Sequence, residues 1–167
     1  GYNELDKKML EFINFKNGFY VDCGANDGVN QSTTWYFESQ LDWKGILIEP
    51  IPSVFNELKK NRNKNNYFQN CALTNSSFEK DYVDFFYNEK DTLTGAIKNK
   101  NNTLKINVIA KTFDKIIDEI NYKGKIDFFS LDVEGNEFEV LDGIDFKKHY
   151  IDYMLIETNN FSKLENF

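Results

Sequence analysis

The sequence has few of the residues on which several classes of protein depend. Its 167 residues include two cysteines, one histidine and two prolines. Cys23 and Cys71 each lie among apolar residues at the end of a predicted strand, which disfavours a secreted disulfide framework and predicts reduced, partly buried thiols. The single histidine, His149, is far from both cysteines in the sequence, so we do not predict a Cys–His nucleophile pair.

Basic residues are also scarce, because acidic residues outnumber them to give a net charge of -7. Binding to phosphates requires clustered lysine and arginine. The one dense basic run, Lys59–Lys64, closes a predicted helix, where cations favour the negative end of the helix dipole. No apolar run approaches a membrane span, and the first ten residues lack a signal-peptide core. We therefore expect a soluble, cytoplasmic protein without nucleic-acid partners or membrane insertion.

Short apolar strands alternate with amphipathic helices along the chain. Because strands this apolar are buried on both faces, the pattern predicts an α/β fold with a doubly wound, mostly parallel sheet. A further strand pair suggests a small β-hairpin insertion, and the length suits one domain over residues 1–167. The predicted strands span 19–23, 45–50, 67–73, 125–135 and 153–157, with the extra pair at 82–88 and 106–112 around a polar loop. The predicted helices are at 4–15, from 30, from 52, at 113–120 and at 138–141.

The first strand runs into a glycine loop, FYVDCGANDG at Phe19–Gly28, with Asp22 and Asp27 on its two sides. Its spacing does not match the G-x-G-x-x-G of a dinucleotide site. The two carboxylates would repel a diphosphate and favour a cationic ligand. For this loop alone, a tight turn capped by Asp22 explains the residues equally well.

Glu49 adds a second signal at the end of the second strand. A carboxylate at this offset accepts the two ribose hydroxyls of a nucleoside in sheets of this kind, where ligands bind beyond the carboxyl ends of the strands. A ligand with a ribose, no phosphate and a positive charge matches S-adenosylmethionine.

Four segments between residues 19 and 157 resemble the FkbM-type S-adenosylmethionine-dependent methyltransferases: VDCGANDGVNQSTTWYFE, WKGILIEPIPSVFNELKKNR, NCAL and IDFFSLDVEGNEFEVLDG. The resemblance implies a Rossmann-like class I methyltransferase fold. It also implies methyl transfer to a hydroxyl oxygen, often on a sugar, a glycan or a related small molecule. In that family the methionine side of the cofactor would be lined by Asp22, Gly24 and Asn26, its carboxylate approached by Ser32, its ribose held by Glu49, and its adenine flanked by Asn70, Cys71 and Ala72.

The chain departs from the family pattern at two places. Ser130 stands before LDVEG where many relatives have lysine, so no role for that lysine is transferred. The chain also ends soon after Glu157, so the last two strands of the class I fold are absent. We therefore expect a methyltransferase domain excised from a longer polypeptide, whose other domains would be partners.

Two carboxylates are candidates for proton transfer. Asp132 and Glu134 lie two apart at a strand end, so the strand period of two would point both side chains the same way. We predict that Asp132 contacts the cofactor or acceptor and that Glu134 is the acceptor-side base, an assignment that the spacing leaves open. The alternatives are a helix-opening role for Glu134, loop amides held by Asp132, or a metal pair, for which no further ligands cluster.

Three residues complete the predicted site. Thr94 and Glu157 are predicted to border the acceptor, although a solvated loop and an exposed strand end explain them as well. His149 is a reserve base.

Three functions remain open at this point. The first is an S-adenosylmethionine-dependent O-methyltransferase acting on a glycan or small molecule. The second is a nicotinamide-dependent oxidoreductase, against which the loop spacing counts. The third is a non-catalytic, methyltransferase-like domain of a multidomain, glycan-modifying protein.

Overall fold

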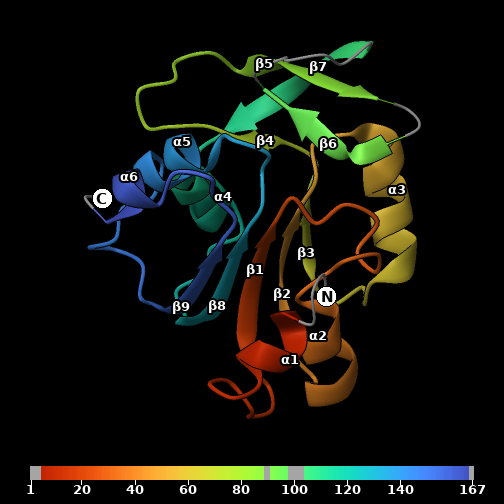
Figure 1. The fold of residues 1–167 in the computed structure, drawn as a ribbon, viewed down its shortest axis with the longest axis vertical. Coiled ribbons are helices and arrows are strands. Elements are labelled where there is room, and N and C mark those ends of the chain that lie inside the picture. Colours follow the sequence, from red (N-terminus) through yellow and green to blue (C-terminus); the bar gives the residue numbers. More distant parts are fainter. Residues whose placement is uncertain (1–4, 89–90, 98–103, 166–167) are drawn as a thin grey trace.

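A five-stranded sheet forms the centre of the protein, whose computed structural model describes residues 5–88, 91–97 and 104–165. The strand order is β3-β2-β1-β8-β9, and all neighbouring pairs are parallel (Figure 1). This confirms the predicted α/β class with a parallel sheet, and the arrangement is consistent with a Rossmann-like fold. The strands are β1 (Phe19–Cys23), β2 (Lys44–Ile48), β3 (Tyr67–Gln69), β8 (Ile126–Leu131) and β9 (Ile151–Ile156).

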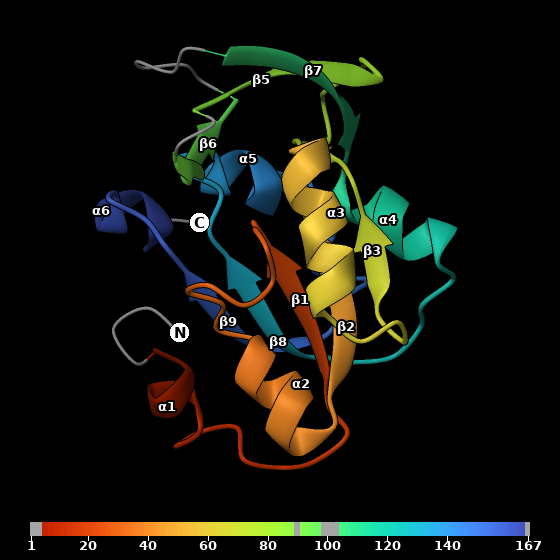
Figure 2. The same cartoon turned by 90° about the vertical axis from the view of Figure 1, so that its right-hand side faces the viewer.

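The central strands are apolar because both faces of the sheet are covered. Every residue of β1 and β8 is buried. Alternate residues such as Val21 and Phe129 pack with the helices α4 (Phe113–Glu119) and α5 (Glu137–Asp142). The residues between them, such as Tyr20 and Phe128, pack with α2 (Trp35–Leu41) and α3 (Pro52–Asn61). The two sets of helices give the sheet its doubly wound form (Figure 2).

A second sheet lies across the end toward which the parallel strands run (Figures 1 and 2). Its strands are ordered β4-β7-β5-β6, and they are β4 (Ala72–Leu73), β5 (Tyr82–Asn88), β6 (Asp91–Ala96) and β7 (Leu104–Lys111). The predicted strand pair is confirmed as the antiparallel pair β5 and β7. The predicted hairpin was too small, because β6 forms within a segment predicted as a loop and β4 joins β7 in parallel.

The single strand predicted at 67–73 was wrong, because the chain leaves the parallel sheet at Asn70. The Asn70 amide donates to the backbone oxygens of Glu49 (2.8 Å) and Pro50 (3.0 Å), which fixes a turn between β3 and β4. The two short strands that result belong to different sheets. This turn carries the chain from the parallel sheet into the second sheet.

Two predicted helices start or end at the wrong residue. The helix predicted from residue 30 begins at Trp35 instead, since the Asp27 carboxylate accepts the N–H groups of Val29 and Asn30 and holds that stretch as a turn. The helix predicted at 4–15 is only α1 (Leu5–Met9). A short α6 (Phe161–Leu164) was not predicted.

In the part of the chain that the structure describes, no helix combines the length and apolarity that crossing a membrane requires.

Candidate functional site

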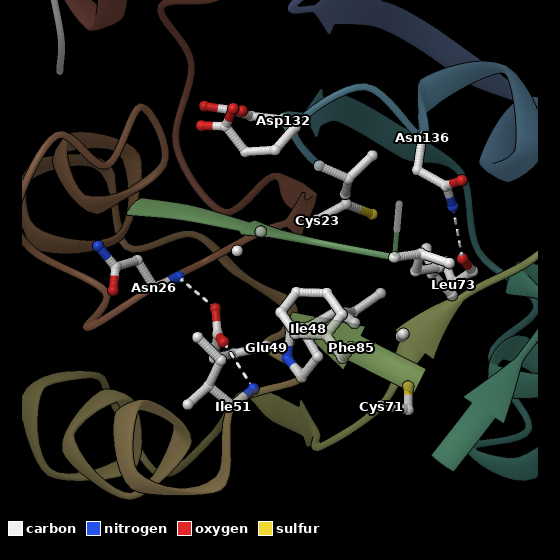
Figure 3. A pocket seen from close by; sticks show the side chains of 17 residues that line it. Cys23, Asn26, Ile48, Glu49, Ile51, Cys71, Leu73, Phe85, Asp132 and Asn136 are labelled. Atoms are coloured by element: carbon white, nitrogen blue, oxygen red, sulfur yellow. Dashed lines mark hydrogen bonds between the residues drawn. The ribbon is translucent and has the colours of Figure 1, made fainter. Parts of the chain in front are cut away.

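A cavity lies between the carboxyl ends of the parallel strands and the second sheet (Figure 3). One side is polar and comes from the loops after β1, β2 and β8. The other side is apolar and includes residues of β5 and of the segment through β6. The sequence-predicted site residues that line this cavity are Gly24, Asn26, Glu49, Cys71, Ala72, Asp132 and Glu134. The apolar side includes Ile51, Leu73, Phe85 and Ile97.

Glu49 is fixed at the end of β2 by two backbone donors. Its Oε1 accepts from Ile51 N at 2.8 Å, and its Oε2 accepts from Asn26 N at 3.1 Å (Figure 3). Burial raises the pKa of Glu49 to about 7, against the lowering effect of these two N–H groups. Because each carboxylate oxygen has a further lone pair, the group can still accept hydrogen bonds from ligand hydroxyls.

Gly24 allows the ends of β1 and β8 to meet beside the cavity. Its φ is +84°, and a Cβ built on it would lie 1.8 Å from the backbone oxygen of Asp132. Gly24 N donates to Ile48 O at 3.1 Å, and Asp132 N donates to Cys23 O at 3.0 Å. A side chain at position 24 would therefore displace the backbone that carries Asp132.

Asp132 and Glu134 both line the cavity, but the predicted reason for this was wrong. β8 ends at Leu131, and Glu134 has a φ of 55° and Gly135 a φ of 94°, so a turn replaces the strand alternation after Leu131. The alternative of a helix-opening Glu134 was also wrong, because α5 begins at Glu137.

The Asp132 carboxyl lies in a strongly acidic environment. Although Asp132 as a whole is exposed, desolvation of its carboxyl group, a hydrogen bond with the Glu157 side chain and the charges of Glu157, Glu134 and Asp22 together raise the pKa of Asp132 to about 8. A carboxyl group with a pKa in this range can exchange protons near neutral pH. Glu157 is thus beside Asp132, although it does not itself line the cavity.

Three predicted cofactor residues lie outside the cavity lining: Asp22, Ser32 and Asn70. Asp22 is buried, accepts from Thr34 Oγ1 and, at 3.5 Å, from Ser32 Oγ, and lies 4.0 Å from Arg62 Nη1. Burial raises the pKa of Asp22, and Arg62 opposes that rise. The Asp22 carboxylate therefore contacts Ser32, Thr34 and Arg62 and does not line the cavity.

Sequence reasoning missed Arg62, the only arginine in the chain, by treating it as part of a basic run whose charge only favours the end of a helix. Its side chain is fully buried and donates to Glu38 Oε2 (2.9 Å), Gly28 O (3.0 Å) and Tyr20 OH (2.8 Å). The neighbouring Asn61 donates to Asp27 O at 2.8 Å. The end of α3 thus holds the glycine loop in place. The one signal in the sequence was the residue type, because Arg62 is an arginine in a chain whose other strongly basic residues are all lysine.

The remaining candidates have separate locations. Thr94 belongs to β6, but its side chain lies outside the described residues. His149 Nε2 lies 3.0 Å from Asp114 Oδ1, and the imidazole packs edge-on against Phe113 in a place that does not line the cavity. Both cysteines are buried free thiols, as predicted in part. Within the described residues, no group of histidine, cysteine and acidic side chains is arranged to hold a metal ion.

The fold and the cavity define an α/β protein with a ligand site at the carboxyl ends of a parallel sheet, where a glycine turn follows the first strand and a buried carboxylate follows the second. The family model for the methyltransferase FkbM domain matches residues 22–166, and the chain therefore belongs to the FkbM methyltransferase family. This confirms the resemblance found in the sequence and supports a methyltransferase. Neither the search of curated proteins nor that of solved structures found a match.

Proposed function

We propose that the protein uses S-adenosylmethionine to methylate a hydroxyl oxygen of a sugar, a glycan or a related small molecule. The observation that carries this proposal is Glu49, a buried carboxylate at the end of β2 that is oriented by Asn26 N and Ile51 N and faces the cavity. Family membership supports the methyl transfer.

The cavity fits a nucleoside that has no phosphate. Glu49 offers acceptor oxygens for the two hydroxyls of a ribose, and the apolar side offers Ile51, Ala72 and Phe85 to an adenine ring. No lysine or arginine is present among the described residues that line the cavity, so a diphosphate would lack a counter-charge. S-adenosylmethionine, when bound, supplies a methyl group on a positively charged sulfur. The nearby carboxylates Asp132 and Glu134 favour that charge.

The residues of the chain would contribute mainly by positioning. Holding two reactants in line can account for about 7–11 kcal/mol of a barrier, whereas a general base adds roughly 10²- to 10⁴-fold in rate. Asp132, with a pKa raised to about 8, suits the base that receives the hydroxyl proton. Glu134 then contacts the acceptor. Phe85 of the second sheet and Ile97, which follows β6, cover the cavity and would limit the access of water.

The test is incubation of the protein with methyl-labelled S-adenosylmethionine and a panel of neutral, acidic and amino sugars, followed by mass spectrometry. We expect a mass gain of one methyl group on at least one hydroxylated acceptor. Asp132→Asn should reduce the rate by about 10²-fold or more. The exposed Glu57→Gln serves as the matched control, with an unchanged rate. Binding of the cofactor without turnover on any acceptor would contradict the proposed reaction and favour a non-catalytic domain.

A further inference from the structure

Asp132 shares a side-chain hydrogen bond with Glu157, a residue of the neighbouring strand end. β8 and β9 run parallel with Leu131 opposite Ile156, and Glu157 N donates to Leu131 O at 2.9 Å. The register of the two strands therefore places the two residues side by side at adjoining strand ends, and the side-chain hydrogen bond joins their carboxyl groups. Only Asp132 lines the cavity, so Glu157 supports it from outside the cavity lining.

The main chain of Asp132 is fixed independently of this pair. Asp132 N donates to Cys23 O at 3.0 Å, and the backbone oxygen of Asp132 lies where a Cβ on Gly24 would clash. With the backbone held by β1, the direction of the carboxyl group depends on its side-chain partner. Glu157 is that partner on the β9 side.

A hydrogen bond between two carboxyl groups requires one of them to carry a proton, since ionised carboxylates only accept. The other charged groups that act on Asp132 are Asp22 from β1 and Glu134 from its own loop, and both are acidic. Glu49 from β2 lines the same cavity, and Glu137 of α5 accepts from Gly135 N at 2.8 Å. Because all these neighbours are acidic, the pair retains a shared proton more strongly than an isolated carboxyl group would.

We propose that Glu157 is a positioning residue for methyl transfer, which through its hydrogen bond aims the Asp132 carboxyl group at the cavity, where Asp132 takes the proton of the acceptor hydroxyl. This proposal rests on the proposed function. During transfer, the O–H bond of the acceptor breaks as its oxygen bonds to the methyl carbon. The carbon–sulfur bond breaks with its electron pair moving to sulfur, and the proton passes to the ionised Asp132 of the singly protonated pair. The pair then carries two protons and releases one of them to water.

The pairing is tested on the ligand-free protein by carbon NMR of labelled aspartate carboxyl groups across a pH series. The Asp132 signal is assigned by its loss in Asp132→Asn. We expect a midpoint near 8 in the parent protein. In Glu157→Gln the midpoint should fall by roughly one unit or more, because a negative neighbour is removed. Glu157→Asp should retain most of the elevation, and Glu57→Gln, on exposed α3 surface, should leave it unchanged.

An unchanged midpoint in Glu157→Gln would overturn the proposal. The pH dependence of methyl transfer gives a second readout that a purely structural role would not move. The midpoint of the pH–rate profile should fall in Glu157→Gln by the same amount as the NMR midpoint. In Glu157→Asp the midpoint should return toward the value of the parent protein. A profile that does not shift in Glu157→Gln would also overturn the proposal. If the parent protein transfers no methyl group, the proposed function fails, whereas the NMR series still decides whether the two carboxyl groups are paired.

Discussion

Gly24 and Asp132 are in such close contact that a Cβ on Gly24 would lie 1.8 Å from the Asp132 backbone oxygen. This contact brings the glycine loop after β1 and the acidic loop after β8 to the same side of the cavity. Position 24 therefore requires glycine for two reasons, the positive φ and the lack of space for a Cβ.

Gly24→Ala should therefore destabilise the protein and displace Asp132. The backbone conformation alone costs a non-glycine residue about 1–3 kcal/mol, and the clash with Asp132 adds to that cost. Gly135→Ala is the matched control, since Gly135 also has a positive φ, 94°, but a Cβ there meets nothing within 4 Å. Urea unfolding should show a larger loss of stability for Gly24→Ala. Equal losses in the two variants would contradict the importance of the Gly24–Asp132 contact.

Arg62→Ala should strongly destabilise the protein, because it leaves the buried Asp22 and the half-buried Glu38 without their cation. Removing one partner of a buried ion pair costs about 3–5 kcal/mol. The control is Lys60→Ala, which breaks an exposed pair with Glu57 that contributes about 0–1 kcal/mol. Denaturant unfolding of both variants measures the difference. Similar stabilities would show that Arg62 does not hold the glycine loop.

The affinity for S-adenosylmethionine should depend on pH through Glu49. Since burial raises the pKa of Glu49 to about 7, the carboxylate becomes protonated as the pH falls through that value and loses acceptor capacity. Binding should therefore weaken below neutral pH. Titration calorimetry from about pH 5.5 to about pH 8.5 brackets this transition. In Glu49→Gln the affinity should be lower, and this pH-dependent step should be missing. A step of the same size in the variant would assign it to another group.

The same shift has a consequence for stability. The folded state holds the Glu49 proton more tightly than the unfolded chain does, since the pKa rises from 4.5 to about 7. This contribution to stability is complete below the unfolded value and is lost as the pH rises through the folded value. At pH 8 we expect Glu49→Gln to unfold at a higher urea concentration than the parent protein. A variant that is less stable at pH 8 and equally stable at pH 4 would contradict this sign.

Gly95→Ala should narrow the cavity from the side of the second sheet. A Cβ at position 95 would lie 2.7 Å from Phe85 Cε1, so the Phe85 ring must shift. We expect weaker ligand binding with a smaller change in stability. The control is Gly124→Ala, where the Cβ meets the Tyr122 side chain at 2.5 Å away from the cavity lining. Calorimetry that finds equal affinity in both variants would exclude β6 from the binding site.

The sequence predicted the parallel sheet well, since the strands β1 and β8 are apolar on both faces and can be stable only inside a layered fold. It predicted the second sheet poorly. β6 carries a polar segment without a clear alternation, and β4 is only two residues long. Their strand character depends on pairing with β5 and β7, which local sequence does not encode.

The candidate site was predictable where a residue's role follows from its place at a strand end. Glu49 and Asp132 line the cavity for that reason. Asp22 was expected to line it as well, but its carboxylate is engaged by Thr34 and faces Arg62. The Arg62 contact joins residues that are far apart in the chain, so no spacing rule could have revealed it. Phe85 was missed because the faces of β5 were unknown until its sheet was known.

The central claim is that the acidic cavity binds an adenosine carrying a sulfonium group in preference to one carrying a diphosphate. Titration calorimetry of the parent protein with S-adenosylmethionine and, separately, with NADH tests this claim most directly. We predict saturable binding of S-adenosylmethionine that is lost in Glu49→Ala, with no binding of NADH. Saturable binding of NADH, and none of S-adenosylmethionine, would contradict the account.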